Sequence, residues 1–342
     1  MSSAAPAVND EGDDRSEFES GASSEAHLPA PEATGSMRWP DFFIVGTQNS
    51  ATTSLYWHLK QHAQIFMPAL KEPHHFSRLA PPHEMRYLVT QVASTQDYLK
   101  LFAHAKTGKL MGEASTSYLW EPGTAKRIHG VNPKAKIIAV LRDPVERAYS
   151  HYQMDRREGW QDKPFLEALQ SDYAATRKGY GISRLYVELG LYAEQIKRYL
   201  DLFGPEQVLV LGFDQFGAKS GGGASGNLTR DIALFLGIEP PAQPNARIER
   251  VENEFRVARF NFTRRLAGNW FARRAGQILI SPQRGSIYTI KRTVFEPLFL
   301  KRAERPPIDS DAKEWLISIF RDDIAALEKL LNRPMPGLRR SW

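Results

Sequence analysis

One segment of this 342-residue chain limits its possible folds most. It is a strand-like apolar run that stops at a glycine and leads through small polar residues into a helix. Residues 42–45 (FFIV) have the continuous apolar character of a buried parallel strand, which ends at Gly46. We expect a helix from about Thr53 to His62. The loop amides and the positive end of the helix dipole favour an anion between them. The unit therefore predicts a phosphate loop, with a plain strand-to-helix turn as the alternative. Its candidate contacts are Gly46, Gln48, Asn49, Ser50, Ala51, Thr52 and Thr53.

Two later apolar runs, at residues 137–141 and 207–212, are further strand candidates. Asp143 is suited to cap a helix and Pro144 to begin it. We expect an amphipathic helix over residues 191–203 and a closing helix over residues 309–331. Strands that alternate with helices favour an α/β fold with a mostly parallel sheet flanked by helices.

Charge divides the chain unevenly. Residues 1–36 hold eight acidic residues and one base, with Phe18 as the only aromatic residue, and are predicted to be a disordered acidic tail. Residues 37–342 are predicted to form the folded domain. Because the whole chain carries a net charge of +6, this domain is strongly basic, which favours anionic ligands. Within it, the basic, aromatic segment 244–305 is predicted to be a helical or loop-rich cap. Nucleic acid is not the expected partner, because no recognition fold accompanies the bases.

The chain contains no cysteine, which excludes disulfides, thiol catalysis and cysteine metal sites. It has no apolar stretch of membrane-spanning length and no secretory signal at its start, so we expect a cytoplasmic protein without a transmembrane segment. Peripheral membrane contact stays open.

A second cluster of reactive side chains follows at residues 71–75, where Lys71, Glu72, His74 and His75 lie among prolines. Glu72 can act as a general base toward a hydroxyl, Lys71 can neutralise negative charge, and His74 can orient the carboxylate. A surface loop with a chance cluster is the alternative. No metal is predicted, because no third ligand is spaced to join the two histidines.

An arginine ends the second predicted strand. Arg142 would lie at the carboxyl edge of the sheet, where open α/β folds bind ligands, and its planar fork suits a terminal phosphate. A salt bridge to Asp143 or Glu146 is the alternative. A kinase-type loop needs a glycine followed by lysine where this chain has Ala51 and Thr52, which disfavours a kinase or GTPase.

Taken together, these segments resemble the sulfotransferases that depend on 3′-phosphoadenosine 5′-phosphosulfate (PAPS), nearest the heparan-sulfate-type carbohydrate branch and its bacterial relatives. Residues 46–53 resemble the 5′-phosphosulfate loop, and Lys71-Glu72-Pro73-His74 resembles the catalytic K-E-x-H stretch. Arg142 and Ser150 match the pair that holds the 3′-phosphate. Residues 112–115 and 190–192 match weaker signatures, and residues 330–342 resemble the C-terminal segment of bacterial members.

The resemblance implies a P-loop-like three-layer domain and a metal-free reaction. PAPS would lie across the loop and the Arg142 site. Glu72 would remove a proton from a hydroxyl of a glycan or glycolipid acceptor, whose oxygen would attack sulfur and release the 3′,5′-bisphosphate.

The loop departs from the family at two positions. Asn49 stands where the family carries lysine or arginine, and Ala51 where it carries glycine. A catalytically impaired protein that still binds the bisphosphate is therefore an alternative, and a P-loop kinase is a more distant one. The family's later basic glycine loop has only residues 283–286 as a candidate.

Overall fold

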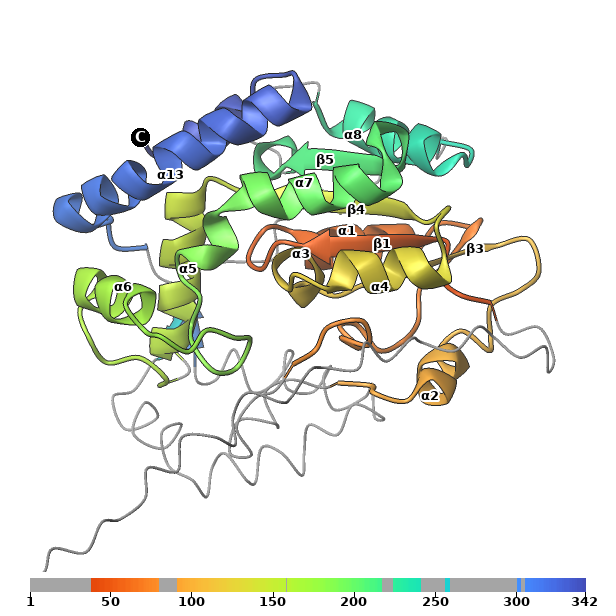
Figure 1. Ribbon diagram of the computed structural model, residues 1–342, viewed down its shortest axis with the longest axis horizontal. Helices are drawn as coiled ribbons and strands as arrows, with labels where there is room; N and C mark the ends of the chain where they lie inside the picture. Colours follow the sequence, from red (N-terminus) through yellow and green to blue (C-terminus); the bar gives the residue numbers. More distant parts are fainter. Residues whose placement is uncertain are drawn as a thin grey trace, which may run out of the picture. The chain divides into compact units, whose positions relative to one another are not determined.

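A five-stranded, fully parallel sheet is the centre of the computed structural model (Figure 1). The structure describes residues 38–79, 91–157, 159–216, 224–240, 256–258, 300–302 and 305–342. The strand order is β2-β3-β1-β4-β5. The strands are β1 (Phe42–Gly46), β2 (Ile65–Phe66), β3 (Leu110–Ala114), β4 (Lys136–Leu141) and β5 (Val208–Gly212), and β6 (Arg256–Ala258) pairs separately with β7 (Leu300–Arg302).

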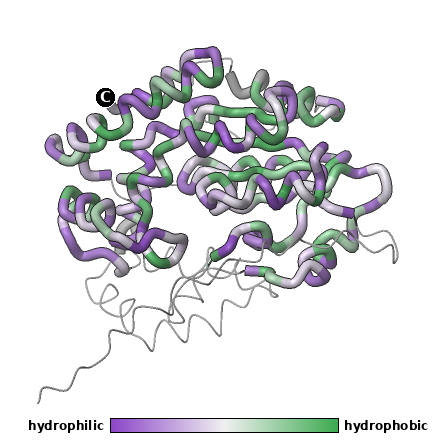
Figure 2. The backbone as a smooth tube through the Cα atoms, in the orientation of Figure 1, coloured by the Kyte–Doolittle hydropathy of each residue, from purple (hydrophilic) through white to green (hydrophobic). Residues whose placement is uncertain are grey.

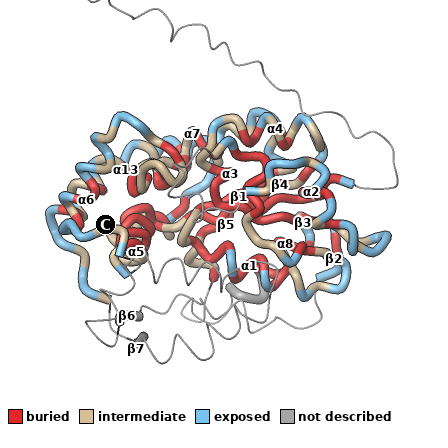
Figure 3. Tube along the Cα trace, turned by 90° about the horizontal axis from the view of Figure 1, so that it is seen from below, coloured by how far each residue is buried: buried red, intermediate tan, exposed pale blue. Residues whose placement is uncertain are grey.

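Helices cover both faces of the sheet, which gives three layers (Figure 3). Side chains alternate along each strand, so residues 42, 44, 138 and 140 point to one face, where they pack with α1 and α8. The other face is covered by α3, α4 and α7 (Figure 1). The strands are hydrophobic along most of their length (Figure 2), as expected for a sheet buried on both sides. The helices on these faces are α1 (Thr52–Lys60), α3 (Ser117–Trp120), α4 (Thr124–Val131), α7 (Tyr192–Phe203) and α8 (Ala224–Leu236).

A second apolar cluster lies beyond the carboxyl end of β4. It joins α5 (Pro144–Arg157), α6 (Phe165–Tyr173) and α13 (Ser310–Leu331), with Phe320 fully buried among them. The short α2 (Thr95–Lys100) begins at a Ser94 side chain that caps the Asp97 amide.

The strand order explains where a ligand can bind. β1 is central, with β3 on one side and β4 on the other: from β1 the chain runs to β2 and β3 on one side of the sheet and then crosses to β4 on the other. Such a switch point opens a crevice above the strand ends. The loops after β1, β3 and β4 therefore meet at this edge.

The predicted α/β fold with a mostly parallel sheet is confirmed. The strand predictions for residues 42–45, 137–141 and 207–212 and the helix prediction for residues 191–203 correspond to β1, β4, β5 and α7. The predicted closing helix corresponds to α13, which Asp309 caps through the amides of residues 311 and 312. The predicted acidic tail, most of the predicted cap over residues 244–305 and the candidate loop at residues 283–286 lie outside the described residues.

Candidate functional site

The loop after β1 has the backbone shape of an anion-binding turn. Gly46 has φ +152°, and a Cβ atom there would lie 2.9 Å from Cβ of Leu119, so only glycine fits. The Thr47 amide donates to the Val140 carbonyl at 2.9 Å, which ties the loop to β4. Asn49 and Ala51 both adopt left-handed φ values, near +64° and +59°. Left-handed residues in a tight loop turn backbone amides toward a common centre, as anion-binding nests do.

Two polar atoms of this loop are buried without a partner. The Asn49 Nδ2 atom and the Ser50 hydroxyl have no hydrogen bond within the described part of the chain. Buried polar groups normally have partners, so these donors fit a ligand at the N-terminus of α1. Thr52 is buried behind them, Thr53 is exposed and Gln48 is half-buried.

Glu72 is attached to the neighbouring strand. Its amide donates to the carbonyl of Ala114, the last residue of β3, at 2.9 Å. Its carboxylate pairs with Lys71 on one oxygen, and its other oxygen lies 3.5 Å from Nε2 of His74. Burial acts to raise the pKa of Glu72, but the Lys71 ammonium and His74 outweigh it and hold the pKa well below its usual range.

His74 is fixed from behind. Its Nδ1 atom lies 2.7 Å from the Ser117 hydroxyl, and its amide donates to the Ser115 hydroxyl at 3.0 Å. The next residue, His75, faces away: its Nδ1 atom bonds the Val92 carbonyl at 2.8 Å. The two histidine side chains therefore contact different parts of the structure, and only His74 lies beside Glu72.

Tyr180 joins the loop to the carboxylate cluster. Its hydroxyl donates to Oε1 of Gln48 at 3.2 Å and lies 3.0 Å from the Thr116 hydroxyl, and its ring centroid is 5.9 Å from that of His74. Burial, with a smaller contribution from the Glu72 charge, raises the pKa of Tyr180, so its hydroxyl stays protonated. One side chain thus touches both parts of the site, a role that sequence reasoning missed because the segment around Tyr180 has no regular periodicity.

Arg142 follows β4 and contacts the loop directly. Its Nη1 donates to the Asn49 carbonyl at 3.2 Å, its Nη2 lies 3.4 Å from Glu146, and its guanidinium lies 4.6 Å from the Phe213 ring centroid. Arg305 binds the same Glu146 carboxylate at 2.6 Å. Burial and the nearby Arg305 charge lower the pKa of Arg142 to about 10, so it remains charged at neutral pH.

Two guanidinium groups therefore share one carboxylate beside the loop. This concentrates positive charge where a second phosphate would lie. Ser150 follows Glu146 by four residues on α5 and is half-buried, which places both on the same side of the helix. In the sequence, Arg305 is only the last residue of the predicted basic cap, and no nearby motif distinguishes it.

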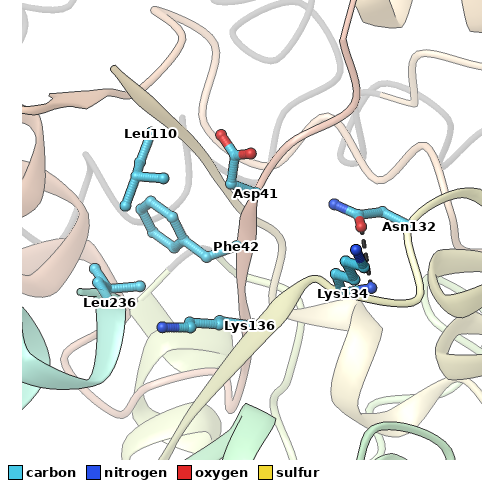
Figure 4. A pocket seen from close by; sticks show the side chains of 7 residues that line it. All are labelled: Asp41, Phe42, Leu110, Asn132, Lys134, Lys136 and Leu236. Carbon is cyan, nitrogen blue, oxygen red and sulfur yellow. Dashed lines mark hydrogen bonds between the residues drawn. The ribbon is translucent and has the colours of Figure 1, made fainter. Parts of the chain in front are cut away.

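A cavity of about 300 Å³ opens at the opposite edge of the sheet (Figure 4). Asp41, Leu110 and Lys136 line it at the amino ends of three strands. Two of its polar side chains already have partners: Asp41 accepts from the Met111 amide at 2.7 Å and Lys136 binds the Phe235 carbonyl. The carboxyl edge, with its unpartnered donors, is the stronger candidate site.

Known proteins resemble this chain in sequence. Residues 40–239 match the model of the Sulfotransferase family. The chain is 26% identical over 317 residues to human bifunctional heparan sulfate N-deacetylase/N-sulfotransferase 3, a match that covers 89% of this chain and 31% of that protein. It is 31% identical over 229 residues to mouse carbohydrate sulfotransferase 15, covering 50% of this chain and 40% of that one. The chain thus spans less than half the length of these relatives.

A solved structure extends the comparison. The crystal structure of a sulfotransferase from Alicyclobacillus acidocaldarius matches with a TM-score of 0.65 and 29% identity, over 88% of this chain and 99% of that one. Among the described residues, none of the helices has both the length and the apolar character needed to cross a membrane.

Proposed function

This chain belongs to the sulfotransferase family, and we propose that it moves a sulfuryl group from PAPS to a hydroxyl of a carbohydrate or glycolipid, releasing adenosine 3′,5′-bisphosphate. The observation that carries the proposal is the contact of Arg142 with the Asn49 carbonyl at 3.2 Å. This contact supports the proposal because it puts the loop after β1 directly beside Arg142, and a doubly phosphorylated nucleotide needs its two binding places near each other. The names of the relatives support a carbohydrate acceptor.

In this proposal the donor is held at two places. The loop amides, Asn49 Nδ2 and the Ser50 hydroxyl bind the 5′-phosphosulfate, with Thr52 and Thr53 at the start of α1. Arg142 and Arg305, with Ser150 on the same side of α5, bind the 3′-phosphate. Before the donor binds, both arginines pair with the Glu146 carboxylate.

Glu72 is the proposed base. It takes the proton of the acceptor hydroxyl, the oxygen forms a bond to sulfur, and the bond between sulfur and the 5′-phosphate oxygen breaks. Lys71 neutralises charge on the sulfuryl oxygens, and His74 keeps the carboxylate in place. Movement of Lys71 toward the sulfuryl group would relieve the low pKa of Glu72 at the moment when a base is needed.

Two measurements on the purified protein test the proposal. The first is its retention on bisphosphate-agarose, and the second is transfer of label when it is incubated with radiolabelled PAPS and a panel of saccharides. Label transfer to a saccharide is the expected result. Binding of PAPS without transfer to any acceptor would contradict it. Cytoplasmic location, the lack of a nucleic-acid partner and possible peripheral membrane contact stay predictions.

One feature favours a second candidate, a bisphosphate-binding protein with impaired transfer. Asn49 offers a neutral amide where the family has a cation, and loss of one such stabilising donor typically lowers the rate by about 10²–10³-fold. Under this second candidate, Asn49→Lys should create transfer where the wild type shows none. An already active wild type would end it.

A further inference from the structure

Asp143 connects Arg142 to a distant part of the chain. It is buried and caps α5, because its Oδ1 atom accepts from the amides of Val145 at 3.0 Å and Glu146 at 3.2 Å. Its Oδ2 atom accepts from the amide of Ser341 at 2.7 Å. A residue nearly two hundred positions away thus completes the hydrogen bonds of the carboxylate beside Arg142.

Ser341 is itself held firmly. Arg339 donates two hydrogen bonds to Glu328 of α13, at 2.6 and 2.7 Å, and its guanidinium lies 5.4 Å from the ring centroid of Trp342. Trp342 packs against the apolar cluster of α5, α6 and α13, and Leu338 is fully buried. These contacts fix the segment from Pro336 to Trp342, which we call the closing tail.

The other side of Arg142 is held from the same helix. The Tyr192 hydroxyl donates to the Arg142 carbonyl at 2.8 Å. The amides of Tyr192 and Ala193 in turn donate to Asp323 of α13, at 2.6 and 3.2 Å. Through Tyr192 and Asp143, then, α13 and the closing tail hold the backbone of Arg142 from two directions.

We propose that the Ser341 amide is a positioning group for donor binding, which acts through Asp143 to set the orientation of Arg142. This inference rests on the proposed function, since it concerns the 3′-phosphate of the same donor. Without the Ser341 amide, one oxygen of a buried carboxylate loses its partner, and such a group rotates or takes up a proton. Burial already raises the pKa of Asp143, and the Ser341 hydrogen bonds oppose that rise. A turn that relaxes there displaces the adjoining guanidinium, and small displacements weaken bidentate recognition strongly.

Ser341→Pro tests the proposal, because proline has no amide hydrogen to donate to Asp143. Ser341→Ala is the matched control, because it keeps the amide and removes only the hydroxyl, which S341P also loses. Calorimetric titration would compare adenosine 3′,5′-bisphosphate with adenosine 5′-phosphosulfate, which lacks the 3′-phosphate. We expect S341P to weaken the bisphosphate about tenfold and the second ligand less than about twofold, as loss of one hydrogen bond to a charged group would. S341A should bind both within about twofold of wild type.

A transfer assay supplies the readout that a merely structural role would not move. S341P should raise the KM for PAPS while kcat at saturating donor stays near wild type. If S341P does not fold, Trp342→Ala replaces it. This variant removes the ring that packs the closing tail against the apolar cluster, which loosens the hydrogen bond from the Ser341 amide to Asp143, and it should likewise weaken the bisphosphate more than adenosine 5′-phosphosulfate. Equal weakening of the two ligands, or unchanged bisphosphate affinity in the folded variant, would overturn the inference. Failure of the wild type to bind the bisphosphate would instead refute the proposed function.

Discussion

Replacing Arg142 by lysine separates charge from geometry at the proposed 3′-phosphate site. Lysine keeps the positive charge but loses the planar fork and the stacking on Phe213, which is 4.6 Å from the guanidinium. A hydrogen bond to a charged group contributes about 1.5–3 kcal/mol, and a cation–π contact about 0.5–2 kcal/mol. In the free protein, however, Arg142 already binds Asn49 and Glu146, so the ligand exchanges these contacts rather than adding to a bare cation.

This exchange selects the lower part of the range. We expect Arg142→Lys to weaken adenosine 3′,5′-bisphosphate by about 2 kcal/mol, or roughly thirtyfold. Adenosine 5′-phosphosulfate, which has no group to reach the fork, should weaken by less than about threefold. Calorimetric titration of the two ligands at constant ionic strength measures both values, and Arg142→Ala should give a larger loss with the same selectivity. Equal losses for the two ligands, or wild-type affinity in the lysine variant, would show that Arg142 does not contact the 3′-phosphate.

Three further outcomes are expected. Glu72→Gln should lower kcat by about 10²–10⁴-fold with bisphosphate affinity unchanged, and substantial remaining transfer would remove Glu72 from the role of base. Gly112→Ala should destabilise the fold by at least about 1–3 kcal/mol in urea unfolding, because its Cβ atom would lie 2.0 Å from the Phe42 ring; wild-type stability would contradict this packing. Burial raises the pKa of Glu113 to about 7, so its contribution to stability is complete below about pH 4 and is lost as the pH rises toward 7. Glu113→Gln should therefore gain stability relative to wild type from pH 5 to 8, by up to about 3 kcal/mol, and parallel pH profiles for the two proteins would refute the assignment.

The strands that could be predicted are those with continuous apolar runs. β1, β4 and β5 are buried on both faces, and their sequences show it directly. β3 was not predicted, because Gly112 and Glu113 interrupt its apolar pattern. The structure explains both residues: Gly112 makes room for the Phe42 ring, and Glu113 is buried with hydroxyl donors from Tyr98, Tyr118 and Ser115. Phe42 lies far along the chain from Gly112, and the hydroxyl donors of Glu113 follow no regular spacing, so the local sequence pattern does not reveal this strand.

The site divides in the same way. The loop at residues 46–53 and Arg142 were predicted from their positions after apolar runs, and the structure brings them into contact. Tyr180 and Arg305 were not, because each reaches the site from an irregular segment whose path only the folded chain reveals. The roles of Glu72, Lys71, His74 and Ser150 stay predictions.

The ion pair between Lys71 and Glu72 also bears on what happens when no acceptor is present. If Glu72 is the base, its lowered pKa in the resting protein makes it too weak a base to activate a water molecule. A bound donor would then be spared futile hydrolysis until a sugar hydroxyl excludes water from the crevice. The same pairing that limits the base at rest would thus favour transfer over decomposition of the donor.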